Sequence, residues 1–156
     1  MVERVYLDTN VYCRPLDSQT SRRVKSESRA FMEIVNIALH GDIVIVSSDY
    51  IRFEIKQIHG SLKRKDVRGF ERALSSVNVA SNKSVIALAK EISSKCSLNS
   101  LDALHLSAAC FGNADYFLTC DDEILTEESR IAKLSAGKGY RLKVRNPVNY
   151  IEERQR

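Results

Sequence analysis

Four acidic residues lie in segments of the chain that are otherwise apolar: Asp8, Glu54, Asp102 and Asp121. Asp8 and Asp121 follow apolar runs of strand length, and Glu54 takes one of the helically spaced positions that isoleucines fill in residues 51–58. Asp102 is the only formally charged residue between positions 97 and 112. Burying a carboxylate costs on the order of several kcal/mol unless a cation or hydrogen bonds compensate. These acids therefore predict a shared divalent-metal site.

Each acid also has a simpler interpretation. An aspartate after a strand can cap the following turn, and a helical glutamate can lie at a solvated edge. A carboxylate in the first turn of a helix is favoured by the helix dipole. The fourth acid is ambiguous, because Asp122 and Glu123 follow Asp121 and one of the three would cap the next helix.

Two polar residues near these acids are further candidates. Asn10 lies two residues after Asp8, where it can hydrogen-bond that carboxylate or a bound water. His105 lies one helical turn after Asp102. A histidine in such a position is more often packed in the core than bound to a metal.

Apolar runs alternate with helical patterns along the chain. The runs predict strands at residues 2–7, 43–46, 77–80, 116–119 and 140–144, and the helical patterns predict helices at residues 21–40, 48–59, 62–75, 84–96, 100–111 and 122–134. Strands that alternate with helices form a parallel sheet covered on both faces, so we expect a three-layer α/β/α fold with about five short strands. Sites in such sheets lie beyond the carboxyl ends of the strands, where Asp8 and one of the acids at 121–123 would meet.

The length of 156 residues suits one domain, predicted at residues 1–151 with a loose tail at 152–156. A strand is predicted almost at Met1, which leaves no room for a signal peptide, and no segment approaches the roughly 18 apolar residues of a membrane span. We therefore expect a soluble, cytoplasmic protein with no membrane partner. The four cysteines lack the spacing of a zinc site and are expected to be reduced thiols.

The net charge of +4 is unevenly distributed. Basic residues concentrate between positions 52 and 72, and the candidates for RNA contacts are Arg52, Lys56, Arg64, Arg68 and Arg72. The last three repeat every four residues, so they form a stripe along one helix face that can follow a phosphate backbone. A solvated helix face is the alternative, because Glu71 interrupts the stripe.

These motifs, in this order, resemble those of the PIN-domain family, and within it the small single-domain VapC toxins. Residues 6–10, Tyr-Leu-Asp-Thr-Asn, are similar to the opening motif, and Glu54 is similar to the second acid. Residues 100–106 resemble the third motif and residues 118–121 the fourth. The sequence departs from the family pattern at Cys120, where a basic or polar residue is common.

The resemblance implies a PIN-like fold and an endoribonuclease that depends on Mg²⁺ or Mn²⁺. The implied catalytic set consists of the four acids and two orienting residues: Asp8, Glu54, Asp102, Asp121, Thr119 and Asn10. Asp8 and Asp102 would bind the metal directly, and the other two acids would hold metal-bound waters or a second ion. The ion would activate a water for attack on the phosphodiester.

The resemblance also implies partners. These are RNA as the substrate, an antitoxin protein if the chain is the toxin of a toxin–antitoxin pair, and a second copy in a homodimer. Two other functions are compatible with the same motifs. A non-catalytic PIN scaffold would bind RNA or protein without cleaving it, although the retention of all four acids argues against this. A DNA-directed nuclease is less favoured, since the chain lacks an insertion for threading a DNA flap.

Overall fold

The central element of the computed structural model, which describes residues 1–156, is a five-stranded sheet in the order β3-β2-β1-β4-β5. All neighbouring strands are parallel. The strands are β1 (Glu3–Leu7), β2 (Ile43–Ser48), β3 (Ser75–Val79), β4 (Tyr116–Leu118) and β5 (Lys143–Arg145). Each overlaps a predicted strand, so the predicted parallel sheet is confirmed.

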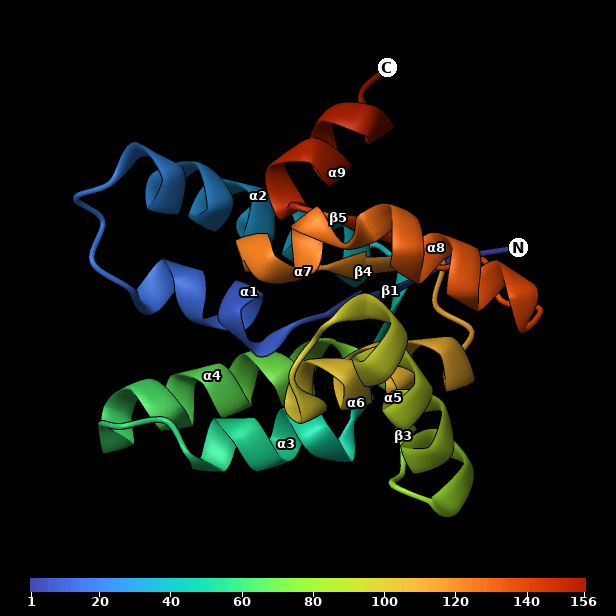
Figure 1. Ribbon diagram of the computed structural model, residues 1–156. Helices are drawn as coiled ribbons and strands as arrows, with labels where there is room; N and C mark the ends of the chain where they lie inside the picture. Colours follow the sequence, from blue (N-terminus) through green and yellow to red (C-terminus); the bar gives the residue numbers. More distant parts are fainter.

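Nine α-helices and one short 3-10 helix connect and cover the strands. They are α1 (Thr9–Cys13), η1 (Arg14–Leu16), α2 (Arg22–Leu39), α3 (Asp49–Lys56), α4 (Ser61–Leu74), α5 (Lys83–Cys96), α6 (Ser100–Phe111), α7 (Asp122–Thr126), α8 (Glu128–Gly137) and α9 (Pro147–Arg154). Helices α2 and α9 lie on one side of the sheet and α3 to α6 on the other, which confirms the three-layer α/β/α arrangement (Figure 1). None of the helices combines the length and the apolar character needed to cross a membrane.

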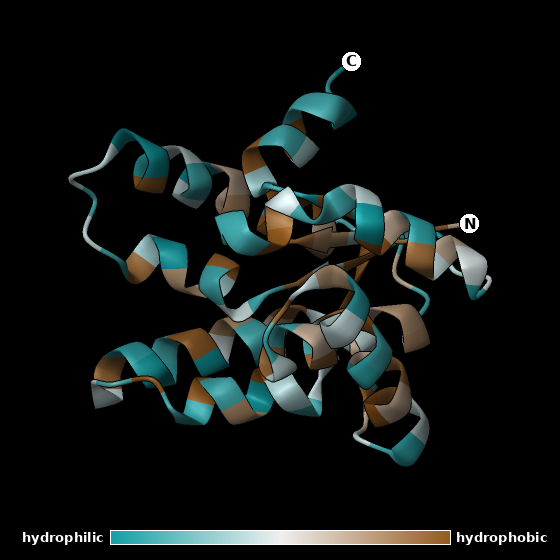
Figure 2. Ribbon diagram, in the orientation of Figure 1, coloured by the Kyte–Doolittle hydropathy of each residue, from teal (hydrophilic) through white to brown (hydrophobic).

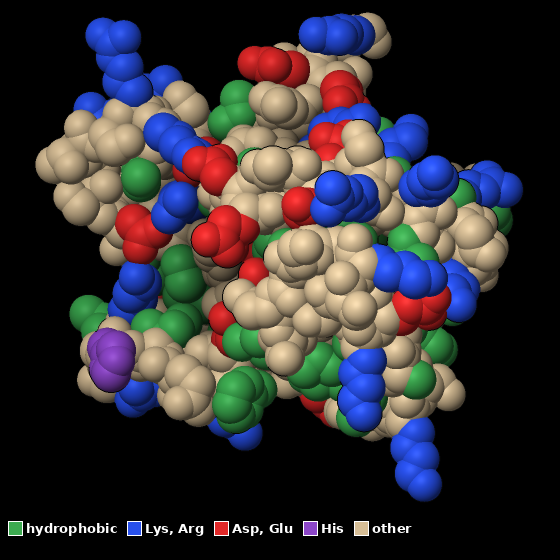
Figure 3. Space-filling view, viewed as in Figure 1, with side chains coloured by type: hydrophobic (Ala, Val, Ile, Leu, Met, Phe, Trp, Pro, Cys, Tyr) green, Lys and Arg blue, Asp and Glu red, His purple; other side chains and the backbone are tan.

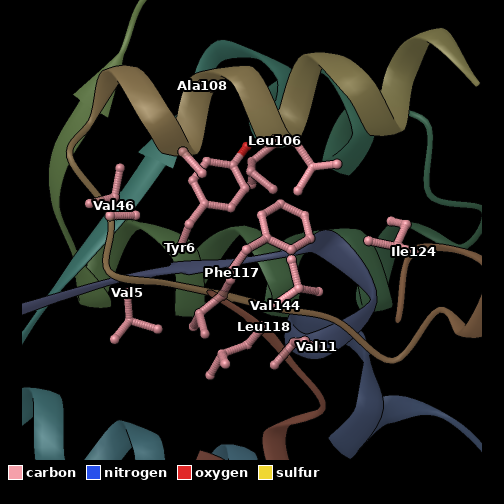
Figure 4. Packing of buried hydrophobic residues seen from close by; sticks show 14 of the residues in the cluster. Val5, Tyr6, Val11, Val46, Leu106, Ala108, Phe117, Leu118, Ile124 and Val144 are labelled. Carbon is pink, nitrogen blue, oxygen red and sulfur yellow. The ribbon is translucent and has the colours of Figure 1, made fainter. Parts of the chain in front are cut away.

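The core lies where the sheet meets the helices. Residues 5–7 of β1 are fully buried, as expected for a central strand that is covered on both faces. Figure 2 shows apolar residues along the strands and on the inward helix faces, and hydrophilic residues on the outward faces. Tyr6 on β1 stacks against Phe117 on β4, with ring centroids 5.3 Å apart, and its side chain points toward the helix that carries Leu106 (Figure 4).

Polar caps determine where the helices that carry two of the acids begin. The Ser48 hydroxyl at the end of β2 accepts hydrogen bonds from the N–H groups of Tyr50 and Ile51 in the first turn of α3. The cap of α6 is Asn99, whose Oδ1 accepts from the N–H of Asp102 at 2.8 Å. Ser100 is the first helical residue, as predicted for the helix at residues 100–111.

The structure differs from the sequence predictions in three helical regions. The helix predicted at residues 122–134 is two helices, α7 and α8, because the backbone leaves helical geometry at Glu127. The sequence does not predict α1 or η1, since five and three residues are too few to show a helical period. It also misses α9, where Asn146 is the cap and Pro147 suits the first turn. This helix continues to Arg154, into the segment that was expected to be a loose tail.

Gly112 ends α6 at a point where the chain passes close to the sheet. A Cβ atom there would lie 2.5 Å from Cγ1 of Val46 and 3.0 Å from Cγ2 of Val79. Gly112→Ala should therefore lower the free energy of unfolding by about 1–3 kcal/mol through overpacking. The matched control is Gly69→Ala in α4, where a Cβ meets nothing within 4 Å. Helix propensity should make that variant more stable by about 0.5–1 kcal/mol. Urea denaturation measures both changes, and equal effects would contradict the close approach at Gly112.

Candidate active site

The carboxyl ends of β1 and β4 lie side by side at the point where the strand order reverses. Ligand sites in parallel sheets form at such a switch point. Asp8 follows β1 directly, and its N–H donates to the carbonyl of Leu118, the last residue of β4, at 2.9 Å. Asp121 lies shortly after the same strand. The fold therefore brings the first and fourth predicted acids to one edge of the sheet.

Asp8 is almost completely buried and is held by three hydrogen bonds. Its carboxylate accepts from the N–H of Thr9 and the hydroxyl of Thr119, both at 2.8 Å, and from Nδ2 of Asn10 at 3.2 Å. Burial raises the pKa of Asp8 above its usual value, even though the bonds from Thr119 and Thr9 favour the charged form. A cation nearby would favour the charged form further.

Thr119 and Asn10 connect the two strand ends around Asp8. The Thr119 hydroxyl, which donates to Asp8, accepts from the N–H of Asp121 at 3.0 Å and from Nδ2 of Asn10 at 3.2 Å. Oδ1 of Asn10 accepts from the N–H of Cys120 at 3.0 Å. The two side chains thus hold the loop after β4 against the start of α1. Their orienting role stays a prediction, and these bonds are the contacts through which it would act.

Glu54 reaches the same place from α3. Its Oε1 accepts from Oγ1 of Thr9 at 2.7 Å and from Nε2 of His105 at 2.5 Å. Burial would raise the pKa of Glu54, but the hydrogen bond and charge of His105 and the bond from Thr9 hold it below its usual value. Burial would lower the pKa of His105, and the bond to Glu54 and the charge of Asp8 raise it instead. Asp8, Glu54 and His105 each present a possible ligand atom within 4.8 Å of the other two.

Asp102 lies in the first turn of α6, and the charges of the other acids affect its pKa. Burial raises the pKa of Asp102 to about 6, and the charges of Asp8 and Asp121 contribute to the increase. Its Oδ2 accepts a hydrogen bond from Nδ2 of Asn99 at 2.9 Å. Asp102 is not part of the tightest group of ligand atoms, which consists of Asp8, Glu54 and His105. The contribution of the Asp8 and Asp121 charges to its pKa is consistent with a shared site, and its role there stays a prediction.

Asp121 and Asp122 have different surroundings. Both terminal nitrogens of Arg23 donate to the Asp122 carboxylate at 2.9 Å, and Nη2 also donates to the carbonyl of Cys120 at 2.7 Å. The charge of Asp122 is therefore compensated. Asp121 caps α7 by accepting from the N–H of Glu123 at 2.9 Å, and no lysine or arginine pairs with it. This geometry favours Asp121 as the fourth acid of the site, an assignment that stays a prediction.

None of the four predicted acids pairs with a lysine or an arginine. Glu54, Asp102 and Asp121 also keep one carboxylate oxygen each, Oε2, Oδ1 and Oδ2 respectively, that accepts no hydrogen bond from the protein. Figure 3 shows acidic side chains in the hollow between α7 and the layer that contains α3, with lysine and arginine side chains around the rim. Such a set of oxygen donors suits a hard divalent cation.

Two other acids, Glu27 and Glu71, are buried elsewhere, and the sequence does not predict their burial. Glu27 in α2 accepts from Nε of Arg14 at 2.8 Å, Nε of Arg23 at 3.2 Å and Nδ2 of Asn146 at 2.6 Å. Only the Arg23–Glu27 spacing of four residues is visible in the sequence as a pairing signal. Glu71 is the second buried acid. Both have arginine partners, unlike the acids at the sheet edge.

The five basic residues predicted to contact RNA line one cavity of about 410 Å³ together with Ile55 and Glu71. Glu71, which was expected to interrupt the basic stripe, is almost completely buried. It accepts from Nε of Arg52 at 3.4 Å and from Oγ of Ser75 at 3.1 Å. Helix α3 carries Glu54 as well as Arg52, so the cavity and the acidic site share one helix. Contact with RNA at this cavity stays a prediction.

The site lies within a segment that matches a known protein family. A family model described as the PIN domain matches residues 5–127, which is more than half of the 156-residue chain. The matched segment runs from β1 to the end of α7 and contains all four acids. A search of curated proteins gives no match to the chain.

Asp102→Asn should make the metal-free protein more stable at pH 8. Because the pKa of Asp102 is raised to about 6, folding disfavours its charged form, and the resulting loss of stability grows as the pH rises from about 4 through 6. Asparagine keeps the acceptor for Asn99 but carries no charge. Since the side chain is partly exposed, the gain should be about 1 kcal/mol at pH 8 in EDTA and close to zero at pH 4.5.

Chemical denaturation at the two pH values measures this difference. The control is Asp122→Asn, because Arg23 holds the pKa of Asp122 below its usual value, so its charge favours the folded state. That variant should not gain stability at either pH. A loss of stability in Asp102→Asn at pH 8 would show that the four acids do not repel one another in the folded protein.

Proposed function

Because the chain belongs to the PIN-domain family, a family of metal-dependent nucleases, we propose that it is an endoribonuclease that uses Mg²⁺ or Mn²⁺. The observation that carries the proposal is that Asp8 and Glu54 present ligand atoms within 4.8 Å of each other beside the switch point between β1 and β4, while the charges of Asp8 and Asp121 contribute to the raised pKa of Asp102. None of these four acids pairs with a lysine or an arginine. Hard divalent cations take oxygen ligands of this kind, and Mg²⁺ needs only one or two carboxylates because it keeps several waters. The donor set therefore fits the ion.

We assign the direct metal contacts to Asp8 and Asp102. Asp8 is held in place by three protein hydrogen bonds, so its orientation is set before an ion binds. Asp102 offers an oxygen without a protein partner, and burial together with the charges of Asp8 and Asp121 raises its pKa to about 6. Glu54 and Asp121 each present one further oxygen and would complete the site through water or a second ion.

A divalent cation bound there supplies positive charge to the transition state of phosphodiester hydrolysis and acidifies the attacking water. The proposed reaction requires no nucleophile from the protein. The Thr119 hydroxyl donates to Asp8, and Cys120 is buried, which raises the pKa of its thiol well above the usual range. Water is therefore the nucleophile in the proposed reaction. The side chains that surround Asp8 serve to hold the carboxylates in position.

The basic cavity between α3 and α4 is the proposed path of the RNA backbone. Five cationic side chains line it, and Glu71 compensates only Arg52 by a direct ion pair. Phosphate groups would supply the missing negative charge. Nothing in this set of four arginines and one lysine indicates base-specific readout, so the proposed contacts position the RNA without selecting its sequence.

The motifs extend the proposal to a cytoplasmic toxin of the VapC kind, with an antitoxin and a second copy of the chain as partners. One surface supports a protein partner. Phe53 on α3 and Leu62 on α4 are more than half exposed, and large apolar side chains exposed on neighbouring helices often lie at interfaces. The alternative function is a non-catalytic scaffold, and an RNA cleavage assay distinguishes it from the nuclease.

Asp8→Asn should abolish metal-dependent RNA cleavage. The substitution keeps the size of the side chain and removes the charge that holds the cation, so the rate should fall roughly 100-fold or more. Purified protein is incubated with labelled structured RNA and Mn²⁺ or Mg²⁺, with EDTA as a blank. Asp122→Asn is the matched control, because Asp122 is bound to Arg23 rather than to the site, and it should cleave at close to the normal rate.

The outcomes separate the alternatives. Equal cleavage by wild type and Asp8→Asn would identify a contaminating nuclease. If the wild type binds Mn²⁺ but cleaves no RNA, the scaffold function gains support over the nuclease.

Arg68→Gln should weaken RNA binding and reduce its dependence on salt. Each lost contact with a phosphate of single-stranded RNA lowers the slope of log K against log salt by about 0.7. Binding is measured by fluorescence anisotropy between 50 and 200 mM KCl with Ca²⁺, which suits oxygen ligands but supports less cleavage. The control is Lys133→Gln on α8, outside the basic cavity. If the two substitutions change the slope equally, the cavity is not the specific path of the RNA.

A further inference from the structure

We propose that Ser48, Tyr6 and His105 form a buried hydrogen-bond chain that positions the carboxylate of Glu54, and that His105 is a positioning residue and not a metal ligand. The chain joins four elements: the end of β2, strand β1, helix α6 and helix α3. Its effect on a bound metal rests on the proposed function. Its existence in the metal-free protein does not.

The geometry of the chain is continuous and almost free of solvent. Oγ of Ser48 lies 2.7 Å from the Tyr6 hydroxyl, which lies 2.8 Å from Nδ1 of His105. Nε2 of His105 lies 2.5 Å from Oε1 of Glu54. Ser48 and Tyr6 are fully buried and His105 is 1% exposed. Only Glu54, at the end of the chain, reaches the partly exposed site.

The helix cap at one end determines the direction of the proton donors. Oγ of Ser48 accepts from the N–H groups of Tyr50 and Ile51, both at 3.2 Å, which occupies both of its lone pairs. The Ser48 hydroxyl must therefore donate its own hydrogen to Tyr6. The Tyr6 hydroxyl is then left to donate to Nδ1 of His105. Against the effect of burial, the hydrogen bond to Glu54 and the charge of Asp8 raise the pKa of His105, but an imidazole that accepts at Nδ1 is neutral. At pH 8 its single proton therefore lies on Nε2 and is donated to Glu54.

This assignment decides between two roles for His105. Asp8, Glu54 and His105 have possible ligand atoms within 4.8 Å of one another, so proximity alone would allow the histidine to bind a metal. A ligating histidine must offer a lone pair. The lone pair of Nδ1 accepts a hydrogen bond from Tyr6, and Nε2 carries the proton that is donated to Glu54. Metal binding by Nε2 would break the bond to Glu54 and reverse the whole chain.

The chain also explains how Glu54 is held. Its Oε1 receives hydrogen bonds from both His105 and Thr9, and its Oε2 receives none. The carboxylate is therefore fixed at one oxygen and open at the other. Partners of this kind orient carboxylates around metals, and their loss typically weakens metal affinity about 10- to 100-fold.

Tyr6→Phe removes one oxygen from the middle of the chain and keeps the ring that stacks on Phe117. Tyr12→Phe is the matched control. Tyr12 is equally buried and its ring packs edge-on against Phe31, but its hydroxyl has no hydrogen-bond partner. An effect seen in Tyr6→Phe but not in Tyr12→Phe therefore comes from breaking the hydrogen-bond chain and not from the loss of a buried hydroxyl in general.

The first measurement is the tautomer of His105 at pH 8, read from the imidazole ¹⁵N resonances of histidine-labelled protein, with His105→Gln for assignment. Without metal, the wild type and Tyr12→Phe should show the Nε2–H tautomer. In Tyr6→Phe the Nδ1 resonance should move downfield, because its lone pair loses a donor. An Nδ1–H tautomer in the wild type, or no change in the Nδ1 resonance in Tyr6→Phe, would overturn the proposed hydrogen-bond chain. This holds whether or not the protein is a nuclease.

The second measurement tests the positioning role. Saturating Mg²⁺ should leave the proton on Nε2, whereas its loss from Nε2 would identify His105 as a ligand. The dissociation constant for Mn²⁺, measured by electron paramagnetic resonance, should rise about 10-fold in Tyr6→Phe and stay within about twofold in Tyr12→Phe. Equal Mn²⁺ affinities would overturn the positioning role. Failure of the wild type and of every variant to bind either ion would refute the proposed function. The spectra of the metal-free protein would still test whether the hydrogen-bond chain exists.

Discussion

The burial of acids that have no lysine or arginine partner is the constraint on which this site depends. Four acids converge at the carboxyl edge of the sheet without a lysine or arginine among them, and the pKa of Asp102 is raised to about 6 as a result of burial and of the charges of Asp8 and Asp121. A fold that keeps such groups together must compensate by neutral donors. At Asp8 these donors are a backbone N–H group, a hydroxyl and an amide, each of which donates one hydrogen bond to the carboxylate.

Helix starts supply part of the compensation. Asp8 caps α1, Asp121 caps α7, and Asp102 lies in the first turn of α6. The positive ends of these helix dipoles thus point toward the acids and attract their negative charges. Capping and metal binding are therefore not competing explanations for these residues. One carboxylate oxygen of Asp121 satisfies the helix, and the other stays available to a cation.

The buried acids fall into two groups that differ in their partners. Glu27 accepts hydrogen bonds from Arg14, Arg23 and Asn146. Glu71 accepts from Arg52 and Ser75. Arginines therefore compensate the charges of both acids within the fold. The acids at the switch point have no lysine or arginine partner, and hydrogen bonds from hydroxyls, amides and His105 orient them. This contrast, more than burial alone, separates a candidate metal site from an internal ion pair.

The sequence by itself determined the local features: the strands and most of the helices, the parallel sheet, the membership of the family, and the placement of acids just after β1, on α3, in the first turn of α6 and after β4. The elements follow from periodicity and caps, which depend on residues close together in the chain, and the family follows from the resemblance of the motifs that contain the acids. Only the tertiary structure decided which groups meet. Arg23 engages Asp122 from 99 positions away and leaves Asp121 without a basic partner, Glu71 turns inward, and both nitrogens of His105 are occupied. Such contacts arise from the packing of distant segments, and no local pattern encodes them.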